Sequence, residues 1–262
     1  MHSGAKAGFF MAIINSAKNF RVLQWAKLKQ KAQRDIQRRF IVEGYHGVAE
    51  ALKAGCLEEV VSLEKAPPFP GKEVPHFHVT YEVMEKLTAM ATPAKMLGIC
   101  RWPDARGVGD SVLVVDEVHH PGNLGTILRS CVAFGVDTVC LNAGVDIFHP
   151  KVVQASQGMI FHVSVLRRGA VELVGELKEK GYQIIGTDVR EGVALGELAT
   201  AKKRVVILGN EGEGVGAALL ALCDTRVNIP MDARCESLNV GVAAGIILYG
   251  LCYNAEKCDG GR

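Results

Sequence analysis

The 262-residue sequence lacks the patterns that identify several common protein classes. None of its eight cysteines belongs to a C-x-x-C pair, which argues against a zinc ribbon and against a thioredoxin-type redox site. The neighbouring His119 and His120 have no matching Asp, Glu or Cys cluster near them, so we expect no metal site. Thiols without a pairing pattern are typical of a reducing compartment, and they indicate a cytoplasmic protein.

Long uncharged runs are almost absent as well. The exception is 237–255, which has no charged residue and contains the spacing Gly241-x-x-x-Gly245, used by packed membrane helices. This stretch is near the lower length limit for a bilayer span, opens with Ser237 and Asn239, and is rich in Gly and Ala. We therefore expect a close-packed helix of a soluble protein and no membrane partner.

The rest of the chain divides into two α/β regions. Residues 1–20 form an N-terminal extension, whose apolar run is too short for a signal-peptide core and in which Met11 is an alternative start to Met1. Residues 21–101 alternate short strands and helices in a small domain, and residues 102–110 form a linker with Gly and Pro. A second domain occupies 111–256, and 257–262 form a tail.

A basic segment lies at the start of the first domain. Between residues 18 and 39 the chain has eight Lys or Arg residues against a single acid, Asp35. Good helix formers occupy 27–37, so we expect a helix that carries Lys27, Lys29, Lys31 and Arg34. Such a segment either binds nucleic-acid phosphates or is a solvated helix face. The net charge of the chain, +2, is too small to decide between the two.

In the second domain, apolar strands alternate with helical patterns. We expect strands at 111–116, 137–141, 163–165, 182–187, 204–208 and 225–229, and helices at 123–134, 150–157, 170–180 and from 237 onward. This alternation predicts a parallel sheet with helices on both faces.

Three short motifs of this domain place polar groups beside residues that shape the backbone. The first, Asn123 to Arg129, follows a Pro-Gly turn and enters a helix, whose N-terminus attracts anions such as phosphate. Taken alone, this motif is more often an N-cap Asn followed by a solvated Arg than a functional element.

The second motif is a glycine-rich turn, 209–216, after the apolar strand that ends at Leu208. Parallel sheets bind ligands at this end of their strands. The turn has neither the dinucleotide fingerprint nor the Gly-Lys-Ser/Thr of a P-loop, and Glu211 and Glu213 would oppose a phosphate. A nucleoside with a cationic sulfonium suits this turn better.

The third motif runs from the strand end Ile229-Pro230-Met231 to Glu236-Ser237-Leu238-Asn239. Ser237 is a fair N-cap for the apolar helix that follows. Asn239 is harder to explain, because we expect it to be buried and a buried amide needs hydrogen-bond partners.

The order and spacing of these motifs resemble those of the SpoU/TrmH family of RNA ribose 2′-O-methyltransferases. The resemblance implies a C-terminal parallel-sheet SPOUT domain with a deep trefoil knot, which uses S-adenosyl-L-methionine and no metal. It implies catalytic roles for Asn123, Arg129, Glu211, Ser237 and Asn239, and cofactor contacts from Leu208, Gly209, Gly212, Ile229, Met231 and Leu238. Arg129 would either accept the proton of the attacking 2′-hydroxyl or orient that hydroxyl.

Two positions depart from the family pattern. His120 stands where the family usually has an acid, and Gly241 where it commonly has Ser. Neither departure removes a catalytic group, but both leave the positioning of the substrate ribose open.

The first domain resembles the small α/β substrate-binding domain that precedes the knotted domain in many members of this family, through 28–34 and 40–44. Members with this domain mostly modify ribosomal RNA, so 23S-type ribosomal RNA is the leading substrate. A transfer-RNA methyltransferase and a non-catalytic RNA-binding module are the alternatives. The resemblance also implies a homodimer through the 237–253 helix, in which Arg129 acts on cofactor bound by the other subunit.

Overall fold

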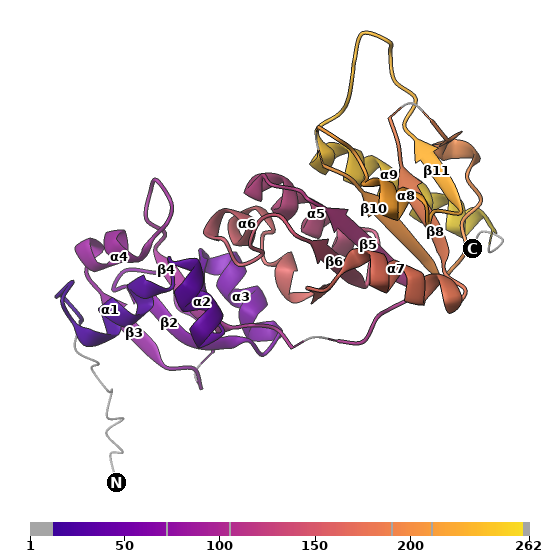
Figure 1. Cartoon of the computed structure of the whole chain (residues 1–262). Helices are drawn as coiled ribbons and strands as arrows, with labels where there is room; N and C mark the ends of the chain where they lie inside the picture. The colour runs from indigo at the N-terminus through magenta and orange to yellow at the C-terminus, as the bar shows by residue number, and fades with distance from the viewer. Residues whose placement is uncertain (1–12, 72, 105, 190, 211, 259–262) are drawn as a thin grey trace. The chain divides into compact units, whose positions relative to one another are not determined.

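The computed structural model describes residues 13–71, 73–104, 106–189, 191–210 and 212–258, the side chains of 253–258 excepted. Two compact units make up the chain, Met1–Trp102 and Pro103–Arg262 (Figure 1). The division falls within the stretch that the sequence predicts to be a linker.

A four-stranded sheet in the order β1-β4-β2-β3 forms the centre of unit 1. Its elements are α1 (Phe20–Lys27), α2 (Lys31–Gln37), β1 (Arg39–Glu43), α3 (Tyr45–Lys53), β2 (Leu57–Leu63), β3 (His76–Val79), α4 (Tyr81–Leu87) and β4 (Met96–Arg101). Trp25 and Leu28 pack with Val83 and Met84 of α4 on strand residues such as Leu97 to make its main core. Unit 1 is therefore a small α/β unit.

The basic segment of unit 1 forms two short helices instead of the one predicted over 27–37. Helix α1 ends at Lys27, and Gln30 is extended, with φ −91° and ψ 131°, before α2 begins. Leu28, between the two helices, is buried in the core beside Trp25. Arg34 of α2 is only 2% exposed, and its guanidinium donates to the carbonyl oxygens of Leu28 and Lys29 at 2.9 and 2.8 Å. Arg34 thus holds the turn between the two helices together.

Unit 2 contains a seven-stranded sheet in the order β7-β6-β5-β10-β8-β11-β9, with every neighbouring pair parallel. Its strands are β5 (Ser111–Asp116), β6 (Thr138–Asn142), β7 (Ser164–Leu166), β8 (Gln183–Thr187), β9 (Val193–Ala194), β10 (Arg204–Leu208) and β11 (Thr225–Asn228). All six residues of β5 are buried, as its predicted burial on both faces requires.

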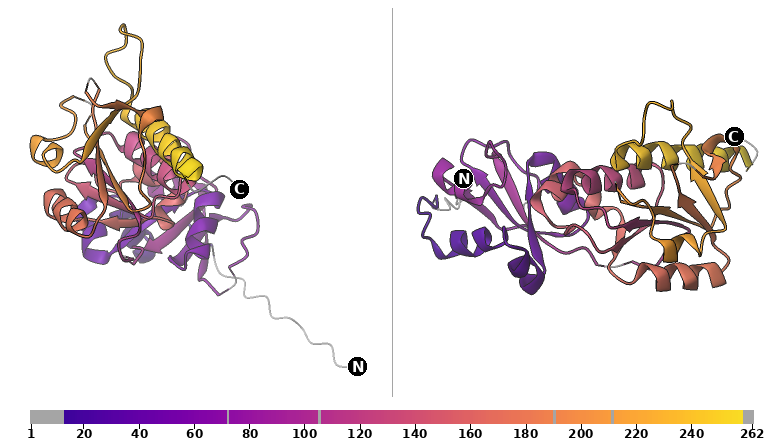
Figure 2. Two further views of the ribbon diagram at one scale, coloured as in Figure 1. Left: turned by 90° about the vertical axis from the view of Figure 1, so that its right-hand side faces the viewer. Right: turned by 45° about the horizontal axis from the view of Figure 1, so that its top comes forward.

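Helices cover both faces of this sheet (Figure 2). They are α5 (Pro121–Ala133), α6 (Pro150–Ala155), α7 (Ala170–Glu179), α8 (Ala217–Leu220) and α9 (Val240–Cys258), with 3₁₀ turns at Met159–Phe161 and Leu195–Glu197. Helices α7 and α8 pack on one face, while α5 and α9 lie together on the other. The predicted parallel α/β fold is confirmed; the knot stays a prediction, since strand order and pairing do not define how the chain is threaded.

The apolar C-terminal helix begins three residues later than its sequence suggests. Its cap is Asn239, whose Oδ1 accepts the backbone N–H groups of Gly241 and Val242 at 3.0 and 3.3 Å. Ser237 is therefore not the cap, and Asn239 is exposed instead of buried, because capping keeps its side chain outside the helix. Within the described part of the chain, none of the helices combines the length and apolarity of a bilayer span.

Candidate active site

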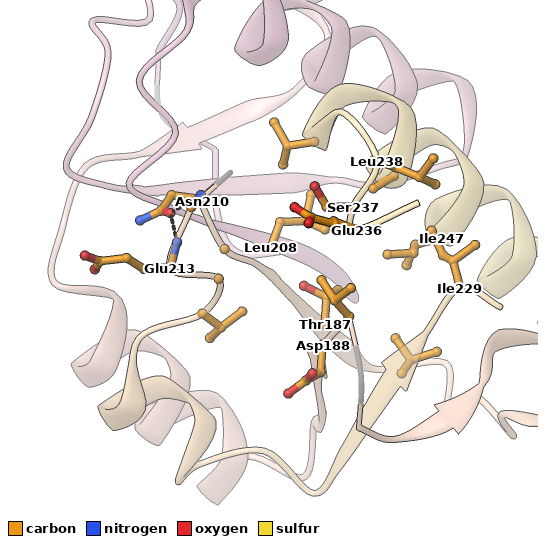
Figure 3. A pocket seen from close by; sticks show the side chains of 18 of the residues that line it. Thr187, Asp188, Leu208, Asn210, Glu213, Ile229, Glu236, Ser237, Leu238 and Ile247 are labelled. Carbon is orange, nitrogen blue, oxygen red and sulfur yellow. Dashed lines mark hydrogen bonds between the residues drawn. The ribbon is translucent and has the colours of Figure 1, made fainter. Parts of the chain in front are cut away.

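A pocket of about 610 Å³ opens at the carboxyl ends of β8, β10 and β11 (Figure 3). The start of α9 and the loop that leads to it complete the wall. The lining residues are Thr187, Asp188, Val189, Leu208, Gly209, Asn210, Gly212, Glu213, Gly214, Val215, Leu220, Val227, Ile229, Met231, Glu236, Ser237, Leu238, Val240, Ala243 and Ile247. They include all six residues expected to contact a cofactor, so the pocket brings the second and third motifs together.

The glycine-rich turn of the second motif is folded back tightly on itself. A Cβ atom on Gly209 would lie 2.0 Å from the carbonyl carbon of Gly214 and 2.2 Å from the nitrogen of Val215. Gly214 has φ +75°, a conformation that L side chains rarely adopt. Glycine is therefore required at both positions for this shape.

Asn210 holds the inside of the same turn. Its Oδ1 accepts the backbone N–H groups of Gly212 and Glu213 at 2.8 and 2.6 Å, and its own N–H donates to the carbonyl of Gly214 at 3.1 Å (Figure 3). This side-chain-to-backbone turn fixes one wall of the pocket.

The charges of the pocket have one sign. Among its described lining residues are three carboxylates, Asp188, Glu213 and Glu236, and no Lys, Arg or His. The carboxylate of Asp188 also lies 3.5 Å from the guanidinium of Arg226, a residue outside the pocket lining. The same guanidinium pairs with the carboxylate of Glu191 at 2.7 Å. The walls between these carboxylates are aliphatic, with Leu208, Leu238 and other branched side chains. The pocket therefore suits a ligand with an apolar body and positive charge.

The first and third motifs meet beside this pocket. The side-chain amide of Asn239 donates to Oδ1 of Asn123 on α5 at 3.0 Å, across 116 positions of sequence. Close packing of α9 on α5 allows the contact, because Gly241 leaves room for Thr126: a Cβ there would come within 3.3 Å of the Thr126 methyl group. The side-chain amides of Asn123 and Asn239, both predicted to be catalytic, are therefore joined by a direct hydrogen bond.

The other predicted catalytic residues lie in different places. Ser237 lines the pocket, but Arg129 is exposed on α5 and is not among the lining residues. Glu211 lies outside the described residues. A single chain thus brings together Asn123 and Asn239, and places Ser237 with the predicted cofactor residues, without bringing Arg129 to them.

Sequence reasoning missed the contribution of β8. Thr187, Asp188 and Val189 end this strand or follow it, and they line the pocket opposite the glycine turn. The sequence predicts a strand at 182–187. In the structure this strand pairs in parallel with β10, so its carboxyl end lies at the edge of the sheet where ligands bind. The residues after it carry no motif, so only the strand order reveals them.

Cys131 of α5 is a buried packing residue. Burial raises the pKa of the Cys131 thiol on α5 far above its ordinary value, which makes it an inert packing group. No three His, Cys, Asp or Glu side chains converge as a metal site would require within the residues that the structure describes.

The four residues predicted to bind RNA are not equivalent in unit 1. Lys27, Lys29 and Lys31, which we call the lysine trio, are exposed, although Lys29 donates to the carbonyl of Lys86 and Lys31 pairs with Asp35 at 2.5 Å. Arg34 is buried, so its charge serves the turn described above and is not presented at the surface.

Comparison with known protein families covers both units. Residues 110–249 match the SpoU rRNA Methylase family, and residues 19–98 match the MRM3-like substrate binding domain. The chain is 36% identical over 246 residues to the 23S rRNA (guanosine(2553)-2′-O)-methyltransferase RlmP of Bacillus subtilis (strain 168), covering 92% of this chain and 99% of that protein.

Solved structures resemble the whole chain as well. A crystal structure of an RNA 2′-O ribose methyltransferase is 30% identical, with a TM-score of 0.81 over 93% of this chain and 99% of that one. An AdoMet-bound rRNA methyltransferase from Sinorhizobium meliloti is 26% identical, with a TM-score of 0.80 over 92% of this chain and 97% of that one.

Proposed function

The chain belongs to the SpoU rRNA methylase family, and we propose that it methylates ribose 2′-hydroxyl groups of 23S-type ribosomal RNA with S-adenosylmethionine as the methyl donor. The observation that carries the proposal is the pocket of unit 2. Its lining contains every residue expected to contact the cofactor, and two of the residues expected to be catalytic are hydrogen-bonded to each other next to it.

The pocket fits S-adenosylmethionine in size and in chemistry. A volume of about 610 Å³ lies in the range usual for ligands of this size. Leu208, Ile229, Leu238 and Ile247 offer aliphatic walls to the adenine, and the backbone of the glycine turn offers hydrogen-bonding groups at close range. The carboxylates favour the positive charges of the ammonium and sulfonium groups. When bound there, the cofactor supplies an electrophilic methyl group.

The residues beside the pocket would manage the ribose hydroxyl. Asn123 and Asn239 are coupled by their hydrogen bond, so each amide is held for an incoming ribose or phosphate group. Arg129 follows on the same helix as Asn123 and supplies the positive charge of the reaction site. A positioned proton acceptor or donor typically contributes about 10²–10⁴ in rate, and correct orientation of the hydroxyl adds to it.

Because Arg129 is outside the pocket lining of its own chain, we propose that two copies complete the site. Helix α9 has a buried face, including Ala244 and Leu251, and an outer face where Val242, Ile246 and Tyr249 are 51%, 39% and 58% exposed. These outer residues are spaced as one helical stripe, and an isologous contact along α9 would cover them in both subunits. The α5 helix packs against α9, so the same contact would carry Arg129 toward the partner's pocket.

The substrate RNA would first meet unit 1. Its lysine trio provides exposed cations, and the match to a substrate-binding domain over 19–98 supports this role. Phosphate contacts of this kind give affinity that falls steeply with salt and carry little sequence information.

Labelled S-adenosylmethionine and deproteinised total RNA test the proposal. We expect methyl transfer to large-subunit ribosomal RNA and a labelled 2′-O-methyl nucleoside after digestion. Arg129→Ala should lose most transfer while calorimetry shows cofactor affinity within a few-fold of the parent. Arg168→Ala is the matched control, since its exposed ion pair with Glu176 contributes little.

Three outcomes would contradict parts of this proposal. A folded protein that binds neither S-adenosylmethionine nor S-adenosylhomocysteine would exclude the methyltransferase assignment. Label found only in transfer RNA would change the substrate. Full activity of Arg129→Ala would remove its catalytic role.

A further inference from the structure

A buried carboxylate outside the three motifs connects three parts of unit 2. Asp116, the last residue of β5, is 6% exposed. Its Oδ2 accepts the backbone N–H of Gly216 at 2.9 Å, and its Oδ1 accepts the side-chain amide of Asn142 at 2.8 Å. Asn142, at the end of β6, in turn accepts the backbone N–H of Ala170 at 3.3 Å through its own Oδ1.

This chain of hydrogen bonds ends on the turn that lines the pocket. Strands β5 and β10 pair with Val115 beside Leu208, so Asp116 leaves the sheet next to Gly209. The turn that begins at Gly209 finishes at Gly216, which Asp116 holds from one hundred positions earlier in the chain. One end of the turn is thus fixed by the sheet and the other by this carboxylate.

The chemistry of the contacts explains why a carboxylate stands here. Both groups that face Asp116 are N–H donors, and an ionised carboxylate offers acceptors on both oxygens. An Asn at this position would turn an N–H₂ group against one of the two donors. Such a mismatch in a buried site leaves polar groups unsatisfied, which costs more than losing an exposed hydrogen bond.

We propose that Asp116 and Asn142 form a positioning pair that keeps the glycine turn in the shape that binds the cofactor. The inference rests on the proposed function only for the identity of the ligand, S-adenosylmethionine. Asp116 touches no reacting atom in this arrangement; it acts through Gly216 and therefore on binding more than on chemistry.

An exchange of the two side chains tests the pair. Asp116→Asn sets two donors against each other, and Asn142→Asp sets two carboxylates against each other. The double variant, Asp116→Asn with Asn142→Asp, restores every bond. Its new amide accepts from Gly216 and donates to the new carboxylate, which still accepts from Ala170. We expect each single variant to bind S-adenosylmethionine at least about ten-fold more weakly than the parent protein. The double variant should recover most of the parent's affinity.

Two measurements separate positioning from general loss of structure. Hydrogen exchange of the backbone amides at 212–216 should speed up in the single variants and return in the double variant, with or without cofactor. Asp224→Asn is the matched control, because Asp224 also accepts a backbone N–H of this sheet, at the amino end of β8, away from the pocket. It should leave cofactor affinity and turn exchange unchanged.

The outcomes distinguish this inference from the proposed function. Single variants that bind cofactor like the parent, or a double variant as weak as either single one, would overturn the positioning pair. If the parent protein binds no S-adenosylmethionine, the proposed function fails, while the exchange of the turn amides still decides whether Asp116 and Asn142 hold the turn.

Discussion

Replacing Gly209 by Ala is the sharpest test of the pocket's architecture. The added Cβ would lie 2.0 Å from the carbonyl carbon of Gly214, where ordinary contacts begin near 3.4 Å, so the turn must retreat by more than an ångström. The obstacle is backbone and cannot rotate away. Overpacking of this kind costs about 1–3 kcal/mol. If this cost falls on the conformation that binds S-adenosylmethionine, the affinity for that ligand falls by about five- to 150-fold.

Gly175→Ala, in α7, is the control. A Cβ on Gly175 meets no heavy atom within 4 Å, and Gly175 is not among the residues that line the pocket. We expect this variant to bind the cofactor within a few-fold of the parent, as measured by calorimetry, while Gly209→Ala binds weakly and unfolds at a lower temperature. Equal binding by both variants would refute the claim that the closed turn shapes the pocket.

Three further predictions concern assembly, RNA and pH. Ile246→Glu should convert a homodimer to monomers by light scattering, whereas Val171→Glu, on the exposed side of α7, should not. Changing the lysine trio to Gln should weaken RNA binding and flatten its salt dependence by up to about one unit of slope for each lost phosphate contact, with cofactor affinity unchanged; identical salt curves would make the trio a solvated face. Burial, and then the charge of His78, lowers the pKa of His76 below its ordinary 6.5. The unfolded chain then binds the proton more tightly, so the free energy of unfolding should fall as pH drops from above 6.5 through the folded pKa, and His76→Gln should reduce that fall in denaturant titrations.

The sequence was most informative where one local pattern decides the structure. Strands such as 111–116 and 204–208 are continuous apolar runs, and the structure has them at the predicted bounds. The two-residue strand Val193–Ala194 and the four-residue helix Ala217–Leu220 were missed, because segments so short have no periodicity of their own. The break after Lys27 was missed because helix propensity favours one helix across 27–37, whereas Gln30 is extended in the structure.

At the site, glycines and motif spacing indicated the pocket, but not the polar groups that hold it. The expectation of a buried Asn239 was wrong because the helix start could not be located within three residues. Arg34 was placed with the lysines on charge alone, since its carbonyl partners appear only when the chain turns between two helices. Asp116 shares no motif with Gly216, and contact across the sheet is what relates them.

The position of β10 within the sheet has a consequence for how the protein is made. Strand β5, all of whose residues are buried, pairs with β6 along one edge and with β10 along the other. The second edge therefore stays unpaired until β10, Arg204–Leu208, has been synthesised. During translation, this open apolar edge would be exposed for the time needed to add nearly a hundred residues, and unpaired edges of that kind recruit other chains. The pocket, whose lining residues all come from 187–247, is assembled last. Ligand binding can therefore stabilise the fold only after residues up to 247 have been made, long after β5.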